Sequence, residues 1–365
     1  MFFLRFIVLL LIFLNFPSWS LVNISSFVGS SLNYITFIFI LIFFIKSEYK
    51  INLPSSLIIL GFLYFSISLF LDSSKAENVL FIILKYFLFI SAFQTLINDS
   101  SDNELLLILF IGSCSIFYEI LTPKNFYGRF SGFYLNPNPA GFVCLVGFWF
   151  SNVIKSKYFK IILKVIFLTA GLATLSRTFG LIFIVTILIS SFSNRSNLYY
   201  ILGVFLGLLI FISFAYKLNF NSYRLAAIQS LINGQISDNL TEDRRTDTWK
   251  KYYNIITNNP IFGIGYLKLS GKTNGYISTP GVHNTPLMIL GEAGILPFLF
   301  FIYFYGKNLI ISFKQSKYND YYIILITIIL YLFTSHNFFD NYIILGISLW
   351  VSHKIKNQFN LTSKF

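Results

Sequence analysis

Arg177, Arg245 and His283 are the residues of this chain whose types and settings suit chemistry. Arg177 lies between two apolar runs, where a cation is costly and usually has a task. Arg245 precedes Trp249 by four residues, and His283 directly precedes another apolar run. Arginine suits phosphate because its guanidinium is a planar fork of donors, and histidine accepts protons near neutral pH. These types predict a site that holds an anion and removes a proton.

Each of the three residues also has a structural interpretation. Arg177 would be an anchor whose stem lies in the membrane. Arg245 would pack on Trp249 or pair with a nearby aspartate, and His283 would cap a helix or lie at the membrane interface. Arg244 is expected to be solvated.

Further residues near these three are candidates for support of the site. Gly263 and Gly265 lack the third glycine and the preceding strand of a dinucleotide fingerprint, so they predict a tight turn beside the site. Asn284 and Glu292 flank the start of the apolar run after His283, and His336 is a second histidine expected on the same side of the membrane. The sequence shows no metal-ligand cluster, and we expect no cofactor.

A helix is expected to carry Arg245. Thr241 is a plausible N-cap, and Arg245, Trp249, Tyr252 and Ile256 recur at the spacing of one helical face. Because that face is apolar, Arg245 should point toward the membrane part of the protein or a cavity.

The composition is that of an integral membrane protein. Of the 365 residues, 56% are hydrophobic, 20% are aromatic and only 11% are charged, and the mean hydropathy is +0.71. A soluble protein averages about 25% charged residues, so the solvent of this chain is mostly the lipid bilayer. The net charge of +13 does not indicate nucleic-acid binding, because most of the lysines and arginines lie in short connections between apolar runs.

The apolar runs predict an all-α, polytopic fold with about 12 transmembrane helices. The first run is flanked like a signal peptide but lacks a cleavage site, so we expect it to remain as a helix. The expected spans are 3–22, 27–45, 54–71, 79–97, 104–121, 138–154, 159–175, 178–193, 198–216, 286–306, 321–335 and 338–352.

The short loops predict the orientation. Fourteen lysines and arginines fall on the side of the two termini and four on the other side. The positive-inside rule then places both termini in the cytoplasm. We expect 1–365 to form a single transmembrane domain, with one large periplasmic loop, 217–285, between the ninth and tenth helices.

Several motifs, in this order, resemble those of the O-antigen ligase and O-antigen polymerase superfamily of bacterial inner-membrane glycosyltransferases. The similarity is clear over about 170–300. The motifs are Thr174-Leu175-Ser176-Arg177-Thr178, Arg245-x-x-x-Trp249, Asn259-Pro260-Ile261-Phe262-Gly263-Ile264-Gly265-Tyr266, His283-Asn284-x-x-Leu287 and Glu292-Ala293-Gly294-Ile295.

The resemblance implies a GT-C-like, metal-independent, inverting glycosyltransferase with its active site on the periplasmic side of the inner membrane. The donor would be a glycan on undecaprenyl diphosphate, and the acceptor a sugar hydroxyl of another lipid-linked repeat or of lipid A core. Arg177 and Arg245 would bind the diphosphate, and His283 would be the catalytic base. A chain-length regulator protein would be a further partner.

Two alternatives stay open at this point. A polymerase and a ligase use the same residues, and we favour the polymerase. A flippase or transporter of lipid-linked oligosaccharides is the alternative from another class. It should have helices interrupted at the membrane midplane and internal repeats. The sequence shows neither clearly.

Overall fold

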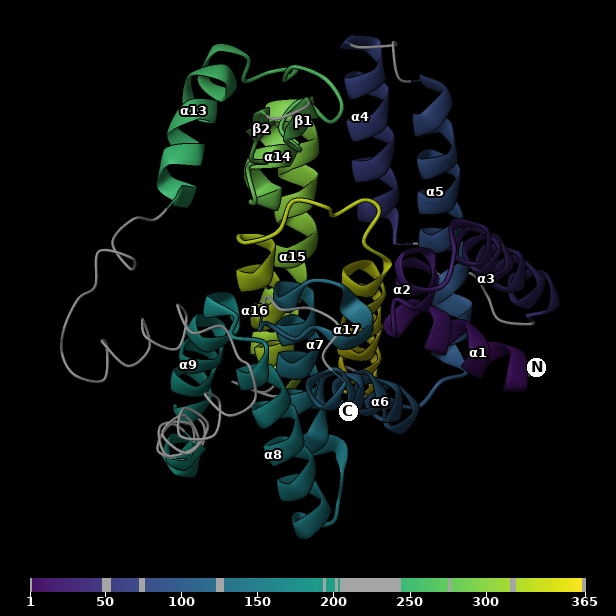
Figure 1. The fold of residues 1–365 in the computed structure, drawn as a ribbon, viewed down its shortest axis with the longest axis vertical. Coiled ribbons are helices and arrows are strands. Elements are labelled where there is room, and N and C mark those ends of the chain that lie inside the picture. Colours follow the sequence, from purple (N-terminus) through teal and green to yellow (C-terminus); the bar gives the residue numbers. More distant parts are fainter. Residues whose placement is uncertain are drawn as a thin grey trace.

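The structure is a computed structural model that describes residues 2–47, 54–71, 76–122, 128–192, 195–200, 203, 244–274, 277–315 and 320–362 (Figure 1). Most of the predicted ninth span, 198–216, and residues 217–243 of the predicted outer loop lie outside the described residues.

Almost every element in the described residues is a helix. The first half contains α1 (Phe2–Phe13), α2 (Phe16–Asn23), α3 (Ser26–Lys46), α4 (Ser55–Leu71), α5 (Ala76–Asn98), α6 (Asp102–Leu121), η2 (Gly132–Tyr134), α7 (Pro137–Phe150), η3 (Ser151–Val153) and α8 (Lys157–Ala173). The second half contains α9 (Arg177–Ser191), η4 (Arg195–Leu198), α13 (Arg244–Asn258), β1 (Lys272–Asn274), β2 (Ile277–Thr279), α14 (Thr285–Ala293), α15 (Ile295–Gln315), α16 (Asp320–Leu332) and α17 (Tyr342–Thr362).

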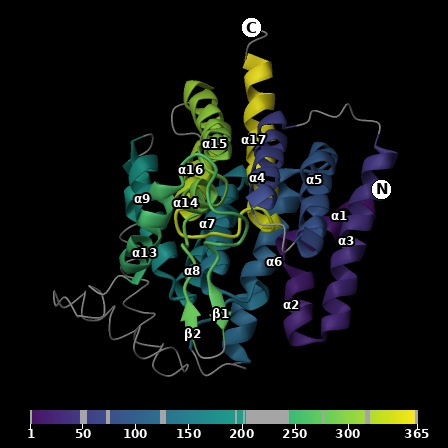
Figure 2. The same cartoon turned by 90° about the horizontal axis from the view of Figure 1, so that it is seen from above.

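The strands β1 and β2 are a detail that the all-α prediction did not include. They pair antiparallel, with Lys272 opposite Thr279. Each strand has three residues, which is too short to give a visible alternation in the sequence. Figure 2 shows this hairpin extending away from the helices.

Four described helices are long and apolar enough to cross a membrane, and a bent pair of helices would add a fifth. At least half of each of the four 18-residue windows is not buried, and large apolar side chains such as Phe62 and Phe70 face outward elsewhere in the bundle. An outward apolar surface of this kind suits lipid. The protein is therefore helical with apolar candidate spans, and the total of twelve stays a prediction.

The first predicted span is two helices rather than one. α1 and α2 meet at an angle of 60°. The bend falls at Asn15, whose φ of 52° is left-handed, and Pro17 stands in the first turn of α2. Asparagine tolerates this conformation better than most residues, and proline suits a helix start.

One end of the bundle is held together by an ionic cluster. Asp102, at the start of α6, accepts hydrogen bonds from Trp350 Nε1 at 2.7 Å and from the Tyr321 hydroxyl, and it pairs with Lys354 Nζ at 3.2 Å. Arg5 of α1 pairs with Glu104. We call Arg5, Asp102, Glu104, Tyr321, Trp350 and Lys354 the inner cluster. The cluster joins the first turns of α1, α6 and α16 to the middle of α17. The charge pattern assigns these parts of the chain to the cytoplasmic side, which stays a prediction.

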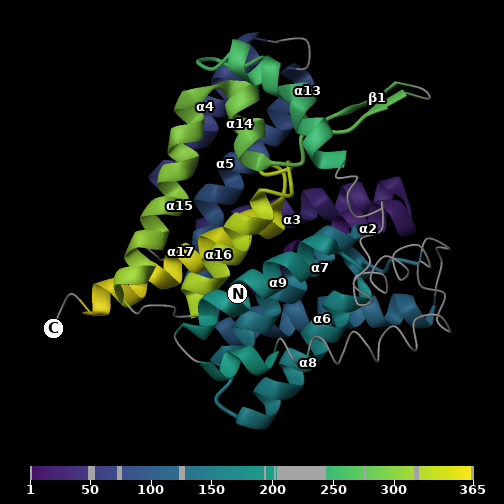
Figure 3. The ribbon, with the colours of Figure 1, turned by 90° about the vertical axis from the view of Figure 1, so that its left-hand side faces the viewer.

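The opposite end of the bundle carries the motif residues. In Figure 3 the C-terminus lies at the left, whereas α2 and the β1–β2 hairpin lie toward the right. The segment 280–284, the start of α14 and the loop 333–341 between α16 and α17 meet near this second end. Because successive helices run through the bundle in opposite directions, the inner cluster and the candidate site lie at opposite ends of it.

Candidate active site

His283 and His336 face each other across 53 residues of sequence. Their Nδ1 atoms lie 3.0 Å apart, and the ring centroids are 4.5 Å apart with the planes at 75°. One imidazole must donate in this contact and the other must accept. His283 is exposed and His336 is half-buried, so the pair opens to solvent on the His283 side.

The backbone places His283 in an uncommon conformation. Its φ is 45°, in the left-handed region that side chains other than glycine rarely adopt. Such conformations cluster at functional sites because the surrounding structure has to hold them. The next residue, Asn284, begins α14 as its N-cap, and its Oδ1 accepts from Leu287 N at 3.0 Å. The capping interpretation of His283 is therefore wrong, because Asn284 is the cap.

One hydrogen bond and one glycine keep the second histidine beside the first. Thr285 Oγ1 donates to the carbonyl of Ser335 at 2.8 Å, which ties the start of α14 to the residue before His336. A Cβ on Gly281 would lie 3.2 Å from His336 Nε2 and 2.6 Å from the carbonyl oxygen of Ser270. Glycine at 281 therefore leaves room for the His336 ring.

Helix α13 is fixed to the segment that ends in His283. Trp249 Nε1 donates to the carbonyl of Val282 at 2.9 Å, and the Tyr252 hydroxyl donates to the carbonyl of Pro280 at 3.0 Å. The predicted apolar face is thus confirmed for these two residues. Arg245 lies one turn before Trp249, on the same face of the helix. The side chain of Arg245 lies outside the described residues.

The glycine motif and the Glu-Ala-Gly motif interlock. Ile264 N donates to the carbonyl of Gly291 at 2.9 Å, and Gly265 N donates to the carbonyl of Glu292 at 3.0 Å. Gly263 has a φ of 72°, and a Cβ there would lie 2.5 Å from the carbonyl carbon of Glu292. Gly294 has a φ of 81°, and a Cβ there would overlap the Ile261 carbonyl. The loop after α13 therefore wraps the break between α14 and α15, and the expectation of a tight turn is confirmed.

Glu292 is buried and serves as an anchor for the same loop. Its carboxylate accepts from Leu269 N at 2.9 Å and from the Tyr64 hydroxyl. The carbonyl of Leu269 in turn accepts from Val282 N at 2.9 Å. Glu292 thus lies two hydrogen bonds away from the residue that precedes His283, which makes it a positioning residue.

Arg177 lies at the first position of α9. Ser176 caps this helix by accepting from Phe179 N at 3.3 Å, and its hydroxyl donates to Asn138 Oδ1 at 2.8 Å. The side chain of Arg177 is exposed. In Figures 1 and 3, α13 lies above α9, and Figure 1 shows its N-terminal end pointing toward α9. The two arginine-bearing helix ends therefore lie on one flank of the molecule.

Burial, and next the neighbouring His283, lower the pKa of His336 from 6.5 to about 4. His336 is therefore uncharged at neutral pH. A neutral imidazole is available as a hydrogen-bond partner for His283 rather than as a competing cation.

Sequence reasoning missed Tyr64 and Arg129. Tyr64 lies in the apolar helix α4, and the signal for it was a stripe of Gly61, Tyr64 and Ser68 at helical spacing. Ser68 Oγ also approaches the carbonyl of Glu292, at 3.4 Å. Arg129 Nε donates to the carbonyl of Thr174 at 3.5 Å, so a second cation lies beside the Arg177 motif.

Within the described residues, no group of three or more His, Cys, Asp or Glu side chains could hold a metal ion. Independence of metal remains a prediction for experiment.

Comparison with known proteins identifies the region that contains these residues. Residues 162–302 match the model of the O-antigen ligase family. The match includes Arg177, Arg245, His283 and Glu292 and ends before His336. No curated protein matched the chain. The resemblance drawn from the motifs is therefore confirmed over residues 162–302, which are similar to the O-antigen ligase family.

Proposed function

We propose that the protein is a glycosyltransferase that moves a glycan from an undecaprenyl diphosphate donor to a sugar hydroxyl of the acceptor. The match to the O-antigen ligase family supports a role in glycan assembly and does not favour the flippase alternative. The observation that carries the proposal is the 3.0 Å contact between His283 and His336 at the start of α14.

His283 is the base in this proposal. If His283 Nδ1 donates to His336 Nδ1, then His283 Nε2 keeps a lone pair that can take a proton. The acceptor oxygen attacks the anomeric carbon, its proton moves to His283 Nε2, and the bond from that carbon to the diphosphate oxygen breaks. The imidazolium that forms keeps its hydrogen bond to His336. His336 therefore orients the base and selects its tautomer.

The arginines bind the leaving diphosphate. Charge develops on the bridging oxygen as the bond breaks, so fixed cations lower the barrier. Arg245 lies one turn before Trp249, whose indole is bonded to the residue before His283. This bond supports placing Arg245 at the reacting centre, and Arg177 completes the clamp from the start of α9. Attack opposite the diphosphate inverts the anomeric centre.

The setting of the reaction follows the orientation expected from the sequence. The site faces the periplasm of a bacterial inner membrane, both termini lie in the cytoplasm, and a chain-length regulator is a further partner. Among members of the superfamily we favour a polymerase, whose acceptor is a second lipid-linked glycan, over a ligase to lipid A core.

A transfer assay with the purified full chain tests the proposal. The protein in lipid nanodiscs should extend or transfer the lipid-linked glycan in excess EDTA and without nucleotide, and undecaprenyl diphosphate should be released. A requirement for added magnesium or manganese would show that the arginines are not the main diphosphate clamp. Failure of the wild-type protein with every lipid-linked glycan of its host would refute the transferase.

A further inference from the structure

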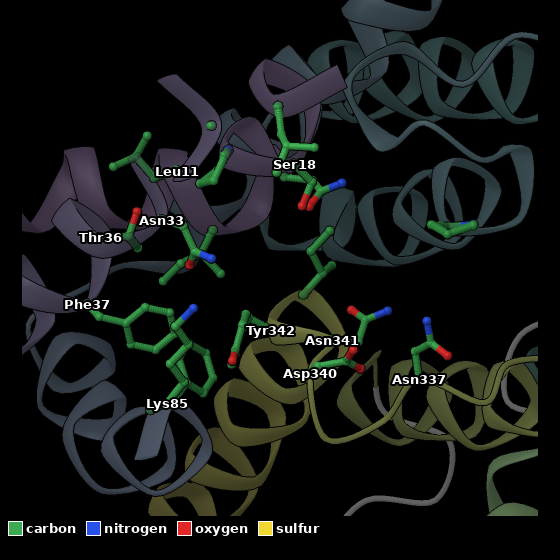
Figure 4. A pocket seen from close by; sticks show the side chains of 18 of the residues that line it. Leu11, Ser18, Asn33, Thr36, Phe37, Lys85, Asn337, Asp340, Asn341 and Tyr342 are labelled. Carbon is green, nitrogen blue, oxygen red and sulfur yellow. The ribbon is translucent and has the colours of Figure 1, made fainter. Parts of the chain in front are cut away.

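A cavity of about 420 Å³, lined by both polar and apolar side chains, lies beside the loop that carries His336 (Figure 4). Its walls come from the bend between α1 and α2, from α3 and α5, and from the loop 333–341 with the start of α17. The volume is within the range of ligand pockets, about 300–1,000 Å³. Figure 4 shows Asn33 and Thr36 of α3 on one side of the open space and Asp340, Asn341 and Tyr342 on the other.

The lining of the cavity is rich in amides that lack partners. Asn15, Asn33, Asn337 and Asn341 all line the cavity. The side chains of the first three make no hydrogen bond to another described residue, and Asn341 uses only its Oδ1, which accepts from Ile344 N at 3.1 Å. Each free amide offers two donors and an acceptor, which is the pattern that sugar hydroxyl and acetamido groups complement.

The charges of the cavity favour a neutral ligand over two others. Lys85 and Asp340 both line the cavity, and neither has an ion-pair partner among the described residues. A diphosphate would meet the Asp340 carboxylate, and an acyl chain would leave both charges and the amides desolvated. A neutral, hydroxyl-rich ligand meets both charges with hydrogen bonds. The half-buried aromatic ring of Tyr342 adds a flat surface for its C–H groups.

The position of the cavity separates it from the arginines. Asn337 directly follows His336, so one short loop contributes both to the histidine pair and to the cavity. Figure 1 shows α9 and α13 on one flank, α2 and α3 on the other, and the loop 333–341 running between them. The α2–α3 wall of the cavity therefore lies on the flank opposite α9 and α13, the helices that begin with the Arg177 and Arg245 motifs.

We propose that this cavity binds a sugar unit of the acceptor glycan and so presents the attacking hydroxyl to the His283–His336 pair. The inference rests on the proposed function. It adds that donor and acceptor approach from opposite flanks, the diphosphate on the α9–α13 flank and the acceptor sugar on the α2–α3 flank.

Two cavity variants test the proposal in the full chain in nanodiscs. The probe is the water-soluble oligosaccharide released by mild acid from the lipid-linked glycan, offered as acceptor against a fixed lipid-linked donor. Asn337→Ala removes one amide and should raise the acceptor KM roughly three- to tenfold. Asn33→Leu fills the space and should raise it further. In both variants kcat and the donor KM should stay near the wild-type values.

Asn254→Ala is the matched control, because Asn254 is an exposed asparagine of α13 that does not line the cavity. It should leave every constant unchanged. Equal acceptor KM values in Asn337→Ala, Asn33→Leu and the wild type would overturn the proposal. A rise confined to the donor KM, or a lipid held by the wild type and lost in Asn33→Leu by native mass spectrometry, would also overturn it.

Saturation-transfer NMR with the same oligosaccharide separates the proposal from the proposed function. Binding should be lost in Asn33→Leu and kept in His283→Gln. Binding that depends on Asn33, together with no transfer by the wild type, would support the saccharide site and refute the transferase. If the wild type transfers glycan and Asn33→Leu binds the oligosaccharide as well as the wild type does, the saccharide site alone would be refuted.

Discussion

The inner cluster and the histidine pair are both built from polar residues brought together from distant parts of the chain, but they differ in how charge is treated. In the inner cluster Asp102 meets Lys354, and Arg5 meets Glu104, so opposite charges are paired. At the other end two like imidazoles face each other, and one of them has a left-handed backbone. Paired charges stabilise a fold, whereas a base held in a strained backbone conformation is typical of a reaction site.

Substitution of His283 should give the largest change in rate. His283→Ala and His283→Gln should each reduce turnover by about 10²–10⁴-fold, because neither side chain accepts a proton at neutral pH. Donor binding and the unfolding temperature should change little. The measurement is turnover of the lipid-linked glycan in nanodiscs.

The control for His283 is His353→Gln, whose native ring contacts Asn357 at 2.8 Å on α17. It should keep wild-type turnover. Retention of most activity in His283→Gln would mean that the role of this histidine is structural, and the contrast between the two clusters would fail.

Arg245 should come next. Arg245→Ala should reduce kcat by about 10²–10³-fold, as expected for loss of one group that stabilises developing charge. Arg245→Lys should recover little, because an ammonium lacks the bidentate fork. Arg244→Ala, one position along the same helix and off the Trp249 face, should be mild. Equal losses at positions 244 and 245 would contradict the assignment of the helix face.

Asp102 tests the other half of the comparison. Asp102→Asn weakens the contacts to Tyr321, Trp350 and Lys354 and should cost about 1–3 kcal/mol of stability. Turnover at a temperature where the variant is folded should equal that of the wild type. Asp99→Asn, at the same end of the bundle, should be neutral in both assays. A variant at Asp102 that stays stable but loses turnover would show that the inner cluster takes part in function.

The smallest effect concerns pH and His336. The pKa of His336 falls from 6.5 to about 4 on folding, so the unfolded chain binds its proton first as the solution is acidified. The contribution to stability is complete above pH 6.5 and is lost as the pH falls toward 4. The unfolding temperature of the wild type should therefore fall more steeply between pH 7 and 5 than that of His336→Gln. Parallel curves would show that the imidazole is not buried beside His283.

The sequence alone determined the elements and the motifs. Apolar runs predicted the positions of α3, α4, α5 and α6 closely, because the length of a spanning helix is set by the bilayer. The span predicted over 286–306 was wrong as a single helix, because Gly294 ends α14 there and α15 continues to Gln315. The spacing of Arg245, Trp249 and Tyr252 predicted a helical face, and two of these residues contact the segment before His283. Local periodicity is sufficient for such predictions, since each depends on residues within a few turns.

The tertiary structure decided which residues meet. The sequence named His283 and His336 separately, but only the packing of α14 against the loop 333–341 brings their Nδ1 atoms to 3.0 Å. Tyr64 reaches Glu292 across 228 residues, and one cavity is lined jointly by α3, α5 and the start of α17. These contacts depend on how helices cross, which is set by side-chain packing over the whole bundle and leaves no period in the sequence.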